Sequence, residues 1–210
     1  MAERYLHATT PEFEYPRRDL PENVELVGAL FPDGVDAWRP PAWWREVVAP
    51  ERRRPAVLVT QGTVATDASK LLLPAVEALA GDDVLVLATT GGADPDDVLP
   101  SGRRPANLRL ETFVPFTELL PYVDAMVTNG GYGGVQTALA HGVPLVTAGR
   151  SEDKMEVNAR VAWSGAGISL RAAYARHDAA GRAADVIVAA APNLVCSPFY
   201  SEEVHVCSER

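Results

Sequence analysis

The stretch Ala125-Met126-Val127-Thr128-Asn129-Gly130-Gly131-Tyr132-Gly133-Gly134-Val135-Gln136 joins a short apolar run to a helical pattern through four glycines. Residues 125–128 fit a buried β-strand, and residues 134–141 fit a helix that ends before Gly142. Glycines at such a junction let the backbone approach a ligand, and the first helical turn offers unpaired N–H groups to a phosphate. A glycine turn without a ligand is the alternative. No Lys-Ser or Lys-Thr follows the glycines, so the stretch is not a Walker loop.

Similar alternations of apolar runs and helical patterns continue on both sides of this stretch. The other runs that fit buried parallel strands are residues 56–60, 84–89, 108–112, 145–148 and 168–170. Helices are predicted at 69–80, 117–123 and 155–164, with an Ala-rich one at 178–190 and with Thr66 and Asp67 as candidate caps of the first. The predicted fold class is therefore α/β, a Rossmann-like doubly wound parallel sheet in one domain at residues 55–190.

The two ends of the chain lack this alternation. Residues 1–54 are rich in proline and predict an extended lead-in, with one weak strand at 24–27. Residues 191–210 carry neither a helical nor a strand period and predict an irregular, poorly ordered tail. Cys196 and Cys207 lie in this tail without CxxC spacing, which favours free thiols over a disulfide or a zinc site.

The charge balance excludes several classes of partner. The 210 residues hold 28 acidic and 19 basic side chains, and the formal net charge is −9. Such a balance repels polyanions, so we expect no nucleic-acid binding and no binding to anionic membranes. The sequence has neither a secretory leader nor an apolar run of membrane-spanning length, which predicts a cytoplasmic protein with no membrane partner. An anionic ligand therefore has to be held locally, by oriented donors.

From Val57 to Leu170 the chain resembles the C-terminal, donor-binding half of inverting GT-B glycosyltransferases of the UDP-glycosyltransferase superfamily, above all bacterial enzymes that act on natural products. Upstream, the segment from Phe13 through Gly28 resembles the linker through which such enzymes enter their second domain. The motifs that carry the resemblance stand in the family's order: Val59-Thr60-Gln61-Gly62-Thr63, residues 107–115, residues 129–139, Gly142-Val143-Pro144, Glu152-Asp153-Lys154 and Asn158-Ala159-Arg160.

The resemblance implies a binding site for a nucleoside-diphosphate sugar. Val114, beside Phe113 and Pro115, would offer backbone hydrogen bonds to the nucleotide base. Gly62 and Thr63 would lie near the phosphates, and Gly130 and Gly131 would let the backbone approach them. The backbone N–H groups of Gly133, Gly134 and Val135 would hold the diphosphate. Without the resemblance, the turn at 113–115 reads as an ordinary strand end and Gly62-Thr63 as a simple loop.

Four positions depart from the family's usual pattern. Asn129 replaces a histidine; its amide can donate to the diphosphate but never carries a charge. Gly134 replaces a serine or threonine and removes one hydroxyl donor. Asp153 would accept from sugar hydroxyls, while Lys154 replaces glutamine and would face the phosphates or a sugar carboxylate, unless it pairs within a solvated loop. Thr137 replaces the glutamate that accepts from both ribose hydroxyls, which favours a deoxythymidine donor over a uridine donor, unless Thr137 is a neutral helix residue.

By resemblance the chain is a donor-binding domain that presents a dTDP- or UDP-sugar for inverting transfer to an acceptor hydroxyl. The acceptor site and the histidine base of that family lie in an N-terminal domain, so we expect no catalytic residue in this chain, with an N-terminal acceptor domain or a separate chain as its partner. None of His7, His141, His177 and His205 falls in a matching motif. The nucleotide sugar would be a co-substrate, and no cofactor and no metal are expected. The alternatives are a noncatalytic nucleotide-sugar-binding subunit of a split glycosyltransferase and half of a nucleotide-sugar epimerase.

Overall fold

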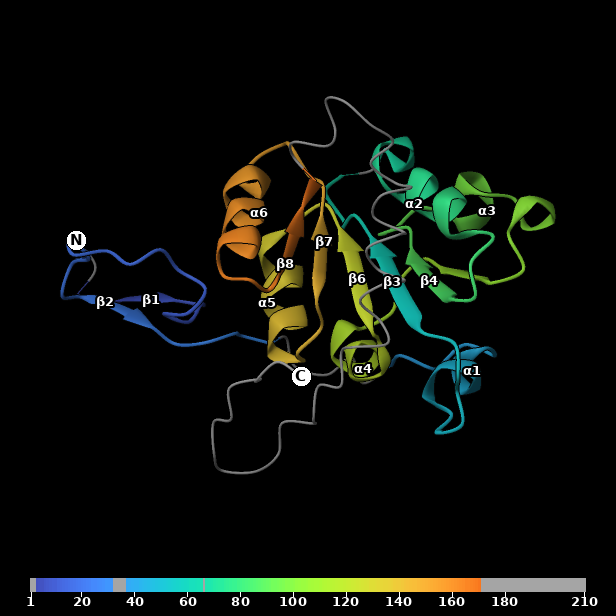
Figure 1. Ribbon diagram of the computed structural model, residues 1–210, viewed down its shortest axis with the longest axis horizontal. Helices are drawn as coiled ribbons and strands as arrows, with labels where there is room; N and C mark the ends of the chain where they lie inside the picture. The colour runs from blue at the N-terminus through green and yellow to red at the C-terminus, as the bar shows by residue number, and fades with distance from the viewer. Residues whose placement is uncertain (1–2, 32–36, 66, 171–210) are drawn as a thin grey trace.

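The computed structural model describes residues 3–31, 37–65 and 67–170 (Figure 1). Several sequence-based predictions lie outside the described residues: the cap Thr66, the helix at 178–190, the tail at 191–210, both cysteines, His177 and His205. In the described part, no helix is long and apolar enough to cross a membrane.

A parallel sheet of six strands forms the centre of the molecule. The strands are β3 (Ala56–Thr60), β4 (Leu85–Thr89), β5 (Leu108–Glu111), β6 (Ala125–Thr128), β7 (Leu145–Thr147) and β8 (Gly167–Ser169). All five residues of β3 and of β4 are buried, as continuous apolar, β-branched runs require when both faces of a sheet are covered. All six predicted strands are confirmed, with ends that differ by at most one residue.

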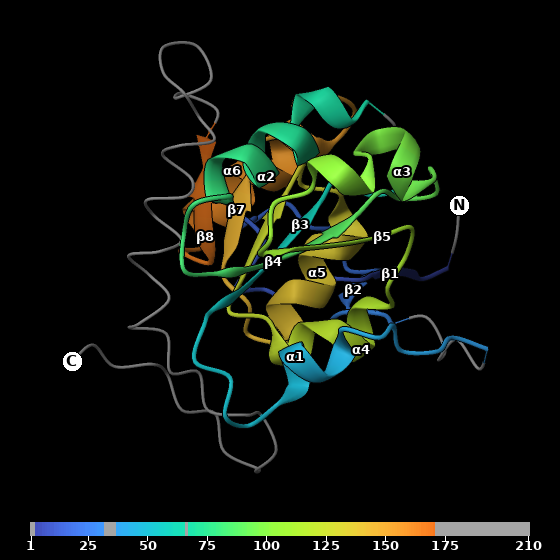
Figure 2. The same cartoon turned by 90° about the vertical axis from the view of Figure 1, so that its right-hand side faces the viewer.

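The strand order is β5-β4-β3-β6-β7-β8, which confirms the Rossmann-like, doubly wound α/β fold (Figures 1 and 2). Within this sheet the chain begins at β3, moves outward through β4 to β5, and then returns to β6 on the other side of β3. The order of strands thus reverses between β3 and β6. In open parallel sheets, ligands bind outside the carboxyl ends of the strands at such a switch point.

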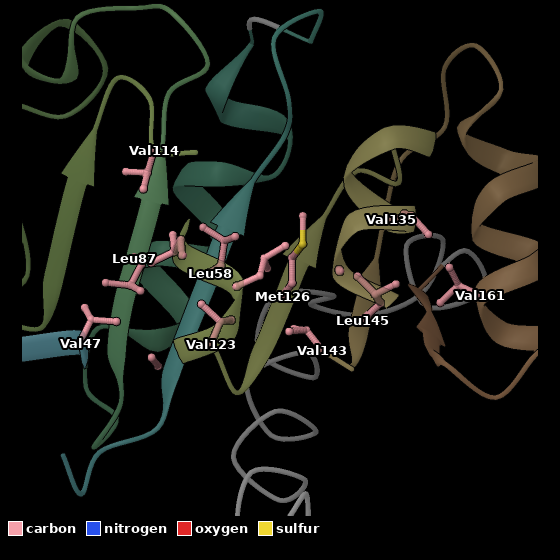
Figure 3. Close-up of a cluster of buried hydrophobic side chains, with 14 of the residues drawn as sticks. Val47, Leu58, Leu87, Val114, Val123, Met126, Val135, Val143, Leu145 and Val161 are labelled. Atoms are coloured by element: carbon pink, nitrogen blue, oxygen red, sulfur yellow. The ribbon is translucent and has the colours of Figure 1, made fainter. Parts of the chain in front are cut away.

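Helices cover both faces of this sheet. On one face, α2 (Leu72–Leu79) packs on Val57 and Val59 of β3. On the other face, Leu58 of β3 belongs to a second core cluster that extends to Val135 of α5 (Tyr132–Ala140) and Val161 of α6 (Lys154–Trp163), as Figure 3 shows. Alternate residues of one strand therefore belong to opposite cores. The remaining helical segments are short: α1 (Trp44–Val48), η1 (Ala68–Lys70), α3 (Pro95–Val98), η2 (Ser101–Arg103), α4 (Phe116–Leu119) and η3 (Leu120–Tyr122).

Three helices differ from the sequence-based prediction. The helix predicted at 69–80 is divided at Leu71, whose backbone departs from helical angles, into η1 and α2. The segment predicted at 117–123 consists of α4 and η3. Helix α5 begins at Tyr132, two residues before its predicted start, because glycines carry no apolar periodicity that marks a first turn. Asp67 does cap η1, accepting a hydrogen bond from the Ser69 N–H.

The lead-in contains regular structure. Strand β2 (Val24–Leu26) confirms the weak strand predicted at 24–27 and pairs in parallel with β1 (Tyr5–His7), which the sequence did not reveal. These two strands lie beside α6 and α5 in Figure 1. Helix α1, farther along the lead-in, is attached to the sheet edge by the pairs Glu46–Arg109 and Trp43–Glu111.

Candidate functional site

The loops that follow β3 and β6 meet at the switch point of the sheet. The Asn129 side chain, 7% exposed, donates from Nδ2 to the backbone carbonyl of Gln61 at 2.5 Å. Its Oδ1 accepts a hydrogen bond from the Gly131 N–H at 3.3 Å. One Nδ2 hydrogen of Asn129 thus bonds within the protein, and this residue fixes the two loops to each other. The expected donation from Asn129 to a diphosphate has only its second Nδ2 hydrogen available.

Helix α5 opens with unpaired backbone donors at this junction. Its N-cap is Gly131, which has no side chain to cap the helix. Among the described residues, no acceptor receives a hydrogen bond from the N–H of Tyr132, Gly133 or Gly134. The Val135 N–H, predicted as a free donor, is instead bonded to the Gly131 carbonyl at 3.0 Å, because the helix starts earlier than predicted. Three donors and the positive end of the helix dipole therefore face outward together.

Two glycines allow the loops to pack closely around these donors. Gly130 has a φ of +88°, and a Cβ there would overlap Oδ1 of Asn158. Gly149, which follows β7, has no positive φ, but a Cβ there would overlap the backbone carbonyl of Asn129. By contrast, Cβ atoms at Gly131 and Gly133 would meet almost nothing. The sequence shows the glycines of this stretch, but it reveals neither Gly149 nor the role of Asn158. Both residues matter through contacts between loops that lie far apart in the sequence.

Thr137 lies one turn beyond Gly133 on α5, as predicted. Its side chain is largely buried, and its hydroxyl donates to the Gly133 carbonyl at 2.8 Å. The hydroxyl proton is therefore committed inside the helix, and toward a ligand the Thr137 oxygen can only accept.

The loop between β7 and α6 places its two predicted residues differently. Asp153 is exposed, and its carboxylate has no hydrogen-bond partner or ion pair among the described residues. Lys154 is 5% exposed and forms an ion pair with Glu152, which has a φ of +53°. Its Nζ also lies 3.4 Å from the Ser151 hydroxyl oxygen. Lys154 thus has a local partner for its charge, although it is buried rather than solvated.

The predicted base and phosphate segments line the same edge of the sheet. Phe113 is 53% exposed, while Val114 is buried, and neither backbone group of Val114 has a hydrogen-bond partner within the described residues. Gly62 has a φ of +71°, and its N–H lies 3.3 Å from Oγ1 of Thr60. Thr63 is exposed. Gly62 and Thr63 are therefore exposed at this edge, whereas the unpartnered backbone groups of Val114 belong to a buried residue.

The lead-in contacts the opening of α5 through side chains that the sequence did not single out for this. The His7 ring stacks on Tyr132, and its Nε2 lies 3.1 Å from the Tyr132 hydroxyl. Glu14 accepts from the same hydroxyl at 3.4 Å and pairs with Arg160 of α6 at 2.9 Å. Burial raises the pKa of Tyr132, which keeps its hydroxyl protonated. His7, which falls in no family motif, therefore lies beside the predicted site.

A cavity lies at the opposite end of the sheet, near the amino ends of β6 and β7. This cavity of about 400 Å³ is lined by α1, η3, the end of α5 and the residues that lead into β6 and β7. None of the predicted site residues lines it. His141 caps the C-terminus of α5 there, and burial lowers its pKa, opposite to the increase that the helix dipole would cause. No cluster of His, Cys, Asp and Glu side chains suited to a metal occurs within residues 3–31, 37–65 and 67–170.

Comparison with known proteins identifies the family of this fold and site. The family model described as "Erythromycin biosynthesis protein CIII-like, C-terminal domain" matches residues 76–203. The chain belongs to this family. The chain is 58% identical over 167 residues to 4'-demethylrebeccamycin synthase of Lentzea aerocolonigenes, covering 80% of this chain and 38% of that protein. It is 45% identical over 172 residues to UDP-glycosyltransferase 2 of Phaeomoniella chlamydospora, covering 80% of this chain and 37% of that protein.

The relatives of this chain include proteins named UDP-glycosyltransferase and UDP-glucosyltransferase. The chain spans about two fifths of the length of the relatives it matches. Among solved structures, the spinosyn rhamnosyltransferase SpnG complexed with thymidine diphosphate superposes with a TM-score of 0.68. It is 22% identical, and the match covers 92% of this chain and 52% of that chain. The likeness shows a common fold, that of the GT-B glycosyltransferases.

Proposed function

We propose that this chain of the CIII-like family is the donor-binding domain of a glycosyltransferase, which holds a nucleoside-diphosphate sugar for transfer to an acceptor hydroxyl. The observation that carries the proposal is the group of three unpaired N–H donors at Tyr132, Gly133 and Gly134, located at the switch point of the sheet. Such donors stabilise a diphosphate both as a ligand and as a leaving group, and this requires no metal or other cofactor. An acceptor-binding domain, or a separate chain that carries one, completes the reaction.

The other groups at this edge of the sheet have matching roles in the proposal. The unpartnered backbone of Val114 receives the base, and Gly62 and Thr63 adjoin the phosphates. The Asp153 carboxylate accepts hydrogen bonds from sugar hydroxyls. Lys154, neutralised by Glu152, supports the loop instead of contacting the phosphates. The names of the relatives, and the thymidine diphosphate bound to a protein of the same fold, support a nucleotide ligand.

Calorimetry of the full chain with dTDP and with UDP tests the proposal. The test compares the wild type with variants in which a glycine is replaced by aspartate. A Cβ at Gly133 meets nothing within 4 Å, whereas one at Gly134 comes within 3.3 Å of Phe116, so Gly133→Asp is the sharper variant. We expect Gly133→Asp to weaken binding by about tenfold or more, because like charges repel beside the phosphates. Gly102→Asp is the matched control, since its Cβ position is equally open and it lies in η2. Equal affinities of the two variants for dTDP and for UDP would contradict the assignment of the phosphate site.

We further propose that Thr137 favours a deoxythymidine donor. A 2′-deoxyribose presents one ring hydroxyl, and the Thr137 oxygen is free only to accept. We therefore expect dTDP to bind at least as tightly as UDP, and Thr137→Glu to shift the preference toward UDP by about tenfold, since a charged hydrogen bond contributes about 1.5–3 kcal/mol. Competition binding measures the shift. A tenfold preference of the wild type for UDP that the variant leaves unchanged would contradict the assignment.

A noncatalytic nucleotide-sugar-binding subunit is the second candidate. It shares the donor site and differs only in its partner, so the same observation of unpaired donors supports it. Activity measured after an acceptor-binding domain is supplied separates the two: transfer favours the enzyme, and binding without transfer favours the subunit.

A further inference from the structure

Asn158 of α6 connects the loops that surround the proposed phosphate site. Its side chain is 2% exposed. Its Nδ2 donates to the backbone carbonyl of Gly149 at 3.0 Å and lies 3.4 Å from that of Asn129. These carbonyls belong to the loops after β7 and β6. Because Asn129 in turn bonds to the Gln61 carbonyl after β3, two buried amides join three adjacent strand ends.

The oxygen of the same amide packs against the glycine loop. Asn158 Oδ1 is buried and has no hydrogen-bond partner among the described residues. It occupies the space where a Cβ of residue 130 would lie, so only glycine fits there. The amide therefore meets the Asn129–Gly130 segment at two points: its nitrogen bonds to the Asn129 carbonyl, and its oxygen fills the space beside Gly130.

We infer that Asn158 is a positioning residue for the nucleotide site: it fixes the Gly130 loop so that the first N–H groups of α5 point at the phosphates. This inference rests on the proposed function. Asn158 itself contacts no reacting group, and it acts through the backbone of Asn129 and Gly130. Donors fixed before the ligand arrives bind it without a further ordering cost.

Asn107 offers a matched control for the loss of a buried amide. It is 6% exposed, its Nδ2 donates to the carbonyls of Leu79 and Val84, and its Oδ1 also lacks a partner among the described residues. It precedes β5 and thus lies at the amino edge of the sheet, opposite the proposed site. If both amides are purely structural, replacing either one should affect the affinity for dTDP equally. If Asn158 positions the site, only its replacement should weaken dTDP binding.

The first experiment compares Asn158→Ala with Asn107→Ala in the full chain. Thermal unfolding gives the loss of stability, and calorimetry gives the affinity for dTDP. We expect both variants to unfold at lower temperature, but only Asn158→Ala to bind dTDP about tenfold more weakly, with Asn107→Ala within about twofold of the wild type. Equal affinities of the two folded variants, in a wild type that binds dTDP, would overturn the inference and leave the proposed function standing.

A second measurement needs no variant and covers the case in which Asn158→Ala does not fold. Nuclear magnetic resonance follows exchange of the side-chain amide hydrogens of Asn158 and Asn107 in the wild type, with and without saturating dTDP. We expect dTDP to slow the exchange at Asn158 and to leave Asn107 unchanged, because binding and the Asn158 contacts stabilise the same loop. Unchanged exchange at Asn158 with dTDP bound overturns the inference. A wild type that binds neither dTDP nor UDP overturns the proposed function, and the inference with it.

Discussion

At the residue scale, glycines of this molecule serve different physical purposes. Gly130 combines a positive φ with close packing against Asn158, while Gly149 is required by packing alone. Gly133 is neither strained nor crowded. The sequence shows that a glycine-rich turn is present, but not which glycines are indispensable, because that depends on atoms contributed by other loops.

This distinction predicts the effect of alanine at two glycines. A Cβ at Gly149 would overlap the Asn129 carbonyl, so Gly149→Ala must displace backbone. We expect it to lower the free energy of unfolding by about 1–3 kcal/mol, as overpacking usually does. Gly133→Ala, in open space on a helix, is expected to leave that free energy unchanged or to raise it by up to about 1 kcal/mol. Urea unfolding measures both, and equal losses would show that the close approach of Gly149 is not what matters.

At the element scale, the central strands β3, β4, β6 and β7 were predictable because each is a largely apolar run that is buried at every residue. The motif at 125–136 predicted β6 and the helix that follows it, whereas the switch point between β3 and β6 is known only from the order of the strands. Strand β1 could not be predicted, since its pairing with Val24–Leu26 spans a proline-rich segment and Leu6 is exposed. The start of α5 was misplaced for a related reason: its first turn is set by the loop contacts of Asn129, not by apolar periodicity.

The C-terminal end of α5 predicts a pH dependence. Burial lowers the pKa of His141 below its ordinary value of 6.5, so protonation favours the unfolded chain. The unfolded chain then binds more protons as the pH falls, and stability contributed by neutral His141 is present above about pH 6.5 and is lost below it. We expect the free energy of unfolding of the wild type to fall more between pH 7.5 and pH 5.5 than that of His141→Gln, by urea unfolding. Parallel curves would contradict this.

At the scale of the whole molecule, side chains of the lead-in contact the helices that border the candidate site. Thr9, fully buried, accepts a hydrogen bond from Gln136 of α5 at 3.4 Å, and Glu14 pairs with Arg160 of α6. The segment before the sheet thus contacts the two helices whose first turns border the site. A domain attached through this segment would be oriented relative to the donor by these contacts.

The final prediction is that the 210-residue chain binds a nucleotide sugar but does not transfer the sugar. Transfer requires a base within hydrogen-bond reach of the acceptor hydroxyl. Of the described histidines, His141 caps the far end of α5, and the Nε2 of His7 already lies against the Tyr132 hydroxyl. We expect chromatography to find no glycoside when the chain is mixed with dTDP- or UDP-sugars and hydroxyl acceptors, and to find product once an acceptor-binding domain is added. Product formed by the chain alone would contradict this. If His7→Gln then abolished that product while His141→Gln did not, the base would be His7, supplied by the lead-in itself.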